Sequence, residues 1–175
     1  MIDLEKEKRA IEKQKVLFEF YKSELDVIKG DFYKLEDKAS KYLTALTLLT
    51  TVLVVLVKDV FEGIGFNLMS FSMLSIFVLI ILSSAASWRF VFMILRPMDV
   101  KELPSDMRIV DYFNNTRLEE FYYGITHSYI GVIESYKACT NEKSDYLKRA
   151  FSEIKTTGLL IIVLIILIML DKVFF

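Results

Sequence analysis

Groups that could carry out catalysis are few in this sequence. His127 is the only histidine, so a cluster of histidines around a metal ion has no second member. Glu119 and Glu120 are neighbours, and neighbouring side chains on a helix point about 100° apart, so their carboxylates cannot converge. Neither a phosphate-binding glycine loop nor a dinucleotide-binding pattern occurs. The sequence therefore predicts a protein that is not an enzyme and that has no metal site and no cofactor.

Polar side chains inside the most apolar stretches are more informative. On helices they fall on two narrow faces, one with Thr44, Thr47 and Thr51, and one with Ser72, Ser75, Ser83 and Ser87. Such faces can pack helices closely together. They can also line a water-filled path in an oligomer, with Lys41 and Lys58 at its mouths. Both interpretations, helix packing and pore lining, remain open.

Arg89 is the one charge near membrane depth, and it follows Trp88. One interpretation is a cation among the lipid headgroups, where tryptophan is also common. The other is a buried partner of an acidic residue, which would make Arg89 a gating element.

A further group of residues combines positive charge with aromatic rings. The candidates for a ligand site are Arg96, Lys101, Arg108, Arg117 and Tyr122. Cations would bind phosphate groups, and rings would stack on bases, so a nucleotide or a single-stranded nucleic acid is the ligand class they suit. The competing interpretation is that the aromatic rings only pack within the protein.

Three apolar stretches must position these side chains. They cover about residues 42–57, 67–88 and 156–170, in a chain that is 54% hydrophobic. Stretches of this kind are typical of helices that cross a membrane. The first is short for a hydrocarbon core of ~30 Å, but the long side chains of Lys41 and Lys58 can reach the interface. We therefore predict an all-α integral membrane protein with about three transmembrane helices.

The charged segments between these stretches are also predicted to be helical. In residues 2–41 apolar side chains recur every seven positions from Leu4 to Ala39, which predicts a coiled-coil-like seam, either on the same subunit or between subunits. In residues 97–155 we expect a loop between Pro97 and Pro104, a helix from about Asp111, a break at residues 140–141 and a last helix from residue 144.

Basic residues predict the orientation of the chain. Ten Lys and Arg precede the first span, ten more lie between Arg89 and Lys155, and Lys58 and Lys172 are the only others. Basic segments stay in the cytoplasm. We therefore expect four parts: a cytoplasmic N-terminal helix (1–41), a transmembrane hairpin (42–95), a cytoplasmic helical segment (96–155) and a C-terminal transmembrane helix (156–175). The 58–66 link and the C-terminus would be periplasmic or extracellular.

Two short stretches carry a resemblance to known proteins. Directly before the first span, Leu35-Glu36-Asp37-Lys38-Ala39-Ser40 resembles the entry to the first span of Pycsar-type transmembrane effectors, which are small bacterial proteins of anti-phage defence. Before the last span, Tyr146-Leu147-Lys148-Arg149-Ala150-Phe151 is similar in kind. The layout of nearly the whole chain is also similar to the membrane effectors of Hailong-type and SLATT-type defence systems.

The resemblance implies a function. Such effectors lie in the bacterial inner membrane as homo-oligomers, for example tetramers, and form or gate a pore that disrupts membrane integrity. It also implies control by a cyclic nucleotide or single-stranded oligonucleotide signal, made by a companion nucleotidyltransferase or cyclase, which opens or closes the protein. The alternative is a non-pore membrane scaffold or sensor subunit that recruits protein partners.

Overall fold

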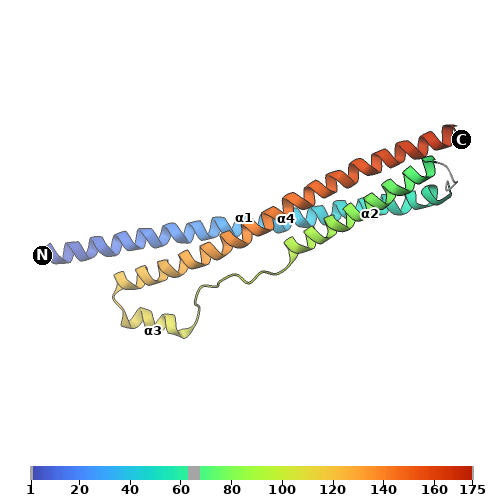
Figure 1. Cartoon of the computed structure of the whole chain (residues 1–175). Coiled ribbons are helices and arrows are strands. Elements are labelled where there is room, and N and C mark those ends of the chain that lie inside the picture. Colours follow the sequence, from blue (N-terminus) through green and yellow to red (C-terminus); the bar gives the residue numbers. More distant parts are fainter. Residues whose placement is uncertain (1, 63–67, 175) are drawn as a thin grey trace. The chain divides into compact units, whose positions relative to one another are not determined.

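The computed structural model describes residues 2–62 and 68–174, and within these ranges every regular element is a helix (Figure 1). The helices are α1 (Ile2–Glu62), α2 (Leu68–Leu95), α3 (Met107–Asn115) and α4 (Leu118–Phe174). Helices α1, α2 and α4 each contain a stretch that is long and apolar enough to cross a membrane. The predicted all-α class and the three helices able to span a membrane are therefore confirmed, while their orientation stays a prediction.

The predicted end of the transmembrane hairpin at residue 95 agrees with the structure, and the other predicted boundaries fall within helices or outside the described residues. Helix α2 ends at Leu95, and Pro97, which cannot continue a helix, opens a loop that contains Pro104. The predicted 58–66 link is still helical up to Glu62, and its residues 63–67 lie outside the described part. The boundaries expected after residues 41 and 155 fall inside α1 and α4, so both helices pass from charged to apolar sequence without a break.

Two predicted boundaries are wrong. The break expected at residues 140–141 does not exist, because α4 is uninterrupted from Leu118 to Phe174. Neither glycine nor proline occurs between Gly131 and Gly158, so nothing in the backbone ends the helix there. The helix expected from Asp111 is two elements, the short α3 and the start of α4, separated at Thr116, whose backbone is extended.

The described chain packs as two units. Unit 1 comprises Met1–Lys34 and Pro97–Glu142, and unit 2 comprises Leu35–Arg96 and Lys143–Phe175. Unit 1 holds most of the charged sequence, and unit 2 holds the apolar parts of α1, α2 and α4.

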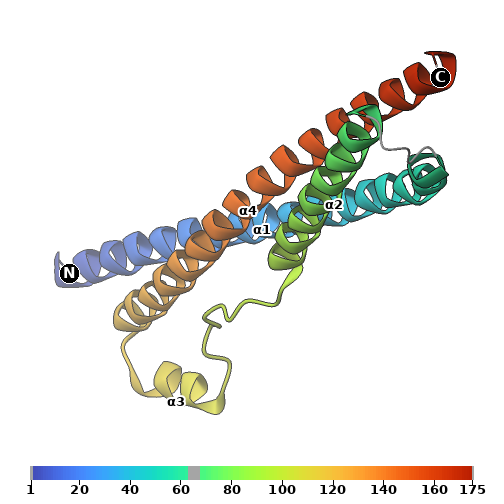
Figure 2. The ribbon, with the colours of Figure 1, turned by 45° about the vertical axis from the view of Figure 1, so that its right-hand side comes forward.

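In unit 2 the second half of α1, the helix α2 and the second half of α4 run side by side (Figures 1 and 2). From α1 the buried side chains are Ala39, Leu46, Leu53 and Val60, which continue the predicted seven-residue row beyond its expected end. Ala39 also meets Ala150 of α4 in one cluster, and both are fully buried. Small side chains at this contact let the helix backbones approach closely.

In unit 1 the first half of α1 packs against the first half of α4. Their apolar side chains meet around Leu25, Ile28, Val132 and Ile133. Ring contacts along the same seam join Phe18 to Tyr122 and Tyr129, and Phe32 to Tyr136. The seven-residue row of α1 is thus occupied within the chain, so of the two interpretations the structure supports packing on the same subunit. Helix α3 buries no residue completely and contacts α4 through Phe113 and Phe121.

Candidate functional site

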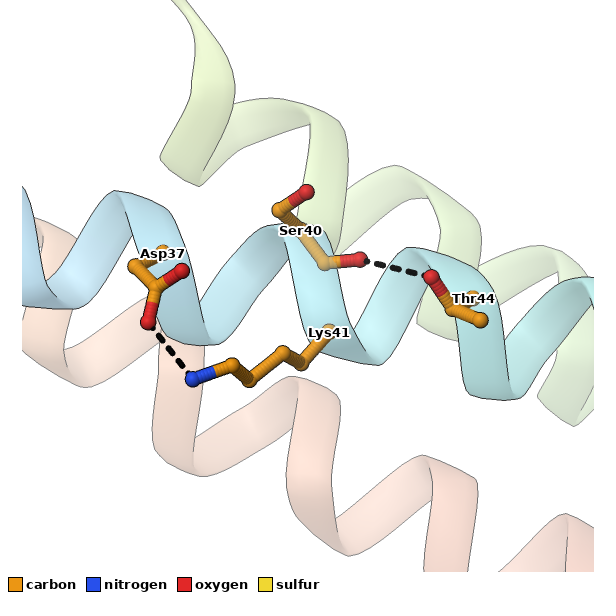
Figure 3. Close-up of polar contacts among 4 residues, drawn as sticks. All are labelled: Asp37, Ser40, Lys41 and Thr44. Atoms are coloured by element: carbon orange, nitrogen blue, oxygen red, sulfur yellow. Dashed lines mark hydrogen bonds and ion pairs between the residues drawn. The ribbon is translucent and has the colours of Figure 1, made fainter.

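The threonine face of α1 (Thr44, Thr47 and Thr51) is exposed, so it is turned away from the packed core of unit 2. Each hydroxyl donates a hydrogen bond to a carbonyl oxygen four residues earlier, at 3.3 Å from Thr44, 2.9 Å from Thr47 and 2.9 Å from Thr51. Figure 3 shows the first of these bonds, between Thr44 and the carbonyl of Ser40. The donors are therefore satisfied without a partner helix, and the oxygen lone pairs and methyl groups remain available.

The surroundings of the threonine face combine apolar side chains with a paired charge. Leu48 and Val55 are also exposed. Lys41, which was predicted to lie at one end of a water-filled path, is paired with an acid. Its ammonium group lies 2.7 Å from the Asp37 carboxylate on the same helix (Figure 3). Within one copy no residue of unit 2 that the structure describes covers this face. Three contacts are open to it: lipid, another copy of the chain, and a water-filled path.

The four predicted serines of α2, which are Ser72, Ser75, Ser83 and Ser87, do not act as one face. Ser72 and Ser75 donate hydrogen bonds to carbonyl oxygens of their own helix, at 2.7 and 2.8 Å, and Ser75 is exposed. Ser83 and Ser87 are buried. The packing interpretation therefore describes Ser83 and Ser87, whereas Ser75 remains available to a partner.

A carboxylate that the sequence analysis did not single out lies between α2 and α4. The hydroxyl of Ser83 donates to Oε2 of Glu153 at 2.8 Å, and it accepts a hydrogen bond from Thr157 at 3.0 Å. Ser87 donates to the backbone carbonyl of Ser83 at 3.0 Å. Thr157 is fully buried and Glu153 is half-buried. This polar network joins the two helices by hydrogen bonds inside an otherwise apolar contact, where such bonds are strengthened by the low dielectric.

A second missed contact is the ion pair between Lys143 of α4 and Glu36 of α1, with 2.5 Å between Nζ and Oε1. The Lys143 side chain is 0% exposed, and that of Glu36 is 34% exposed. In the structure, buried α4 side chains recur every seven residues at Lys143, Ala150, Thr157 and Leu164. The sequence hides this row, because two of its four members are polar. The period assigns Lys143 to the core in spite of its charge.

Arg89 is exposed on α2, and in the ranges 2–62 and 68–174 it has no ion-pair partner. The neighbouring Trp88 ring packs against Phe92 with 5.5 Å between ring centroids. This placement fits a cation at the lipid headgroups. A gating role for Arg89 stays a prediction.

The candidate ligand residues lie in separate surroundings. Arg96, Lys101, Arg108 and Arg117 are all exposed. Arg108 pairs with Asp106, while Tyr122 is half-buried against the Phe18 ring, as the packing interpretation expects. Arg117 lines a groove of about 740 Å³ that it shares with basic Lys6 and with acidic Glu7 and Glu119. The mixed charge of this groove does not favour an anion over a cation.

A smaller cavity of about 200 Å³ lies between α3 and α4 in unit 1. It is lined by Pro104, Ile109, Tyr112, Phe121, Gly124, Ile125 and Ser128. Typical small-molecule sites have volumes of roughly 300–1,000 Å³, so this cavity is too small for a nucleotide as it stands. Tyr112 of α3 packs directly against Gly124 of α4 in the wall of this cavity. Only glycine allows this approach, since a Cβ atom at position 124 would lie 2.7 Å from the Tyr112 hydroxyl.

Two tyrosines in the seam of unit 1 have perturbed acidity. Burial raises the pKa of Tyr129, and the negative charge of Asp26 adds to the effect. Burial likewise raises the pKa of Tyr136, with smaller contributions from Tyr33 and Glu102. The neutral phenol is the form that the fold favours.

These raised pKa values predict a pH dependence. A tyrosine whose folded-state pKa is raised contributes stability that is complete below its ordinary pKa of about 10 and is lost as the pH rises through the folded-state pKa. We expect unit 1 to loosen above about pH 10, as followed by tyrosinate absorbance together with circular dichroism. Tyr136→Phe should weaken this dependence, whereas the exposed Tyr123→Phe should leave it unchanged.

Among the residues described, no group of three or more His, Cys, Asp and Glu side chains is placed to hold a metal ion. Comparison of the chain with protein-family models, with curated proteins and with solved structures finds no match. Function must therefore be argued from the geometry of the chain itself.

Proposed function

We propose that several copies of this chain assemble in a membrane and together form or gate an ion-conducting path. The observation that carries the proposal is the exposed threonine face of α1. Three hydroxyl-bearing side chains on one face, turned away from the chain's own core, suit a surface that meets water or another subunit.

The core of unit 2 explains why several copies are needed. The contacts between α1, α2 and α4 are filled by apolar side chains such as Leu53, Ile80 and Leu164. A filled apolar core offers no route for ions. A path must therefore run between copies, where the exposed face of α1 from each copy can line it.

The protein is further proposed to lie in the bacterial inner membrane and to be controlled by a ligand. We expect the charged unit 1 to lie in the cytoplasm of a bacterium, with the path in its inner membrane, as the basic residues and the resemblance to anti-phage effectors suggest. A nucleotide or oligonucleotide from a companion nucleotidyltransferase or cyclase would bias the path through its different affinities for the open and closed states. Arg96, Lys101, Arg108, Arg117 and Tyr122 remain its candidate contacts.

The test is ion release from liposomes that contain the full-length protein. Ligand-free protein, a cyclic nucleotide and a short single-stranded oligonucleotide provide the three conditions. We expect release in at least one of them, and a decrease of at least about tenfold for Thr47→Leu, because a bulky apolar side chain replaces a hydroxyl in the path.

The matched control for this variant is Thr156→Leu. Thr156 is also exposed and also donates to a carbonyl four residues earlier, but it lies on α4. Release by this variant should equal that of the wild type. Tight liposomes in all three conditions, or equal losses in both variants, would contradict the proposal.

A scaffold that recruits protein partners is the second candidate function, and one observation favours it. In unit 1, the α1 side chains Val16, Phe20 and Val27 are each about 60% exposed and lie on one helical face. Apolar side chains grouped on a surface in water mark sites of protein contact. A scaffold would tolerate Thr47→Leu without loss of function and would give no ion release in any condition.

A further inference from the structure

One end of unit 2 carries an excess of basic side chains on all three of its helices. Residues 35–43, 88–96 and 143–155 hold eight Lys and Arg but only four Asp and Glu. At the opposite end, residues 58–62 and 171–172 hold two lysines and three acids. The excess of positive charge therefore belongs to one end of the unit.

The four acids at the basic end are already engaged within the chain. Their contacts are Glu36 with Lys143 at 2.5 Å, Asp37 with Lys41 at 2.7 Å, Asp145 with Lys148 at 3.1 Å, and Glu153 with the Ser83 hydroxyl at 2.8 Å. Five cations are left over, which we call the basic belt: Lys38, Arg89, Arg96, Arg149 and Lys155. All five are exposed, and none has an ion-pair partner among the residues that the structure describes.

Aromatic contacts place members of the basic belt at one level. The rings of Tyr42 and Phe151 stack with centroids 6.1 Å apart, and those of Phe90 and Tyr146 with centroids 6.4 Å apart. Lys38, Arg89 and Arg149 each lie within about one helical turn of one of these rings. Aromatic rings together with cations at the end of apolar helices are typical of the membrane–water interface.

We propose that the basic belt binds the phosphate headgroups of anionic phospholipids in the adjoining leaflet. Lys and Arg beside a membrane surface attract anionic lipids, and the guanidinium groups of Arg89 and Arg149 can each hold a phosphate through two hydrogen bonds. Exposed apolar side chains such as Leu82 and Leu159 lie on the same helices, on the membrane side of Arg89 and Lys155, where acyl chains would pass. Three separate helices contribute cations to the belt, which suits several lipids better than one soluble anion.

The test compares two short-chain lipids added to the full-length protein in a zwitterionic detergent. Dioctanoyl phosphatidylglycerol should raise the midpoint of thermal unfolding, while dioctanoyl phosphatidylcholine should not, because only a lipid that binds the folded state stabilises it. The variant Arg89→Gln, Arg149→Gln, Lys155→Gln should need at least a tenfold higher concentration of the anionic lipid for the same shift. This readout is independent of ion conduction.

Two controls keep the result specific. Arg9→Gln, Lys13→Gln, Lys22→Gln removes three exposed cations from unit 1 and should behave as the wild type. Arg89→Lys with Arg149→Lys keeps the charge and should keep most of the lipid response. Equal shifts with both lipids, or a belt variant that folds and responds as the wild type does, would overturn the proposal. So would an equal shift with glycerol phosphate, which would assign the belt to a soluble phosphate.

Discussion

Glu36→Ala is expected to lower the stability of unit 2 by about 2–3 kcal/mol. The Lys143 ammonium group is fully buried and lies 2.5 Å from the Glu36 carboxylate, so the variant removes an opposite charge that is in direct contact with a buried one. Breaking a fully buried ion pair from one side costs roughly 3–5 kcal/mol. We expect somewhat less because Glu36 is partly exposed, which allows water to replace part of the lost interaction.

The neighbouring Asp37 supplies a matched control. Asp37 pairs with Lys41 at 2.7 Å, but both side chains are mostly exposed. An exposed pair of this kind contributes less than about 0.5 kcal/mol on a helix. Unfolding in mixed micelles with rising amounts of a denaturing detergent should therefore separate Glu36→Ala clearly from Asp37→Ala.

The double variant Glu36→Leu, Lys143→Met tests the same argument from the opposite side. Replacing both partners of a buried pair by apolar side chains is often neutral, because the desolvation of the charges disappears with their attraction. We expect it to lie within about 1 kcal/mol of the wild type. Equal stabilities for Glu36→Ala and Asp37→Ala would show that burial of Lys143 has no energetic consequence.

The helical layout followed from the sequence because periodicity and apolar length are local signals. The row from Leu4 to Ala39 predicts a long α1, and the structure extends the same period through Leu46, Leu53 and Val60. The corresponding row of α4 was harder to detect, since it includes Lys143 and Thr157 among its buried members. The poor helix formers Thr140 and Asn141 indicated a break, but packing of the helix outweighs their small propensity cost.

The candidate site was only partly predictable for a different reason. Periodicity places Thr44, Thr47 and Thr51 on one face, and the structure shows that this face is exposed. Periodicity in the sequence does not specify which other helix a given face contacts. Ser83 was recognised as polar, but its partner Glu153 is 70 residues away and was assigned to the aqueous segment. Long-range partners of this kind follow from the crossing of helices, which the sequence pattern does not specify.

Ser83→Ala should be the most destabilising single hydroxyl removal in unit 2, at about 1.5–3 kcal/mol. The Ser83 hydroxyl is both the donor to Glu153 and the acceptor for Thr157, so the variant leaves two partners unsatisfied in a buried contact. Hydrogen bonds to charged groups contribute roughly 1.5–3 kcal/mol. Ser75→Ala is the matched control on the same helix, since the exposed Ser75 bonds only its own backbone, and it should change stability by less than about 0.5 kcal/mol.

Glu153 variants separate the role of the charge from that of the hydrogen bond. Glu153→Gln keeps a side-chain oxygen that can accept from Ser83, whereas Glu153→Ala removes the carboxylate and leaves Ser83 the Glu153 backbone carbonyl at 3.2 Å as its acceptor. If the hydrogen bond to the side chain matters and its charge does not, the glutamine variant unfolds like the wild type. The alanine variant then loses stability, but less than Ser83→Ala, because the bonds of Ser83 with the Glu153 backbone carbonyl and with Thr157 remain. If the charge is required, both Glu153 variants lose stability equally. In both cases a double-mutant cycle between Ser83→Ala and Glu153→Ala should give a coupling energy of about 1 kcal/mol or more. Each variant removes the hydrogen bond between the Ser83 hydroxyl and the Glu153 carboxylate. Additive losses would mean that the bond between Ser83 and the Glu153 carboxylate does not stabilise the contact between α2 and α4.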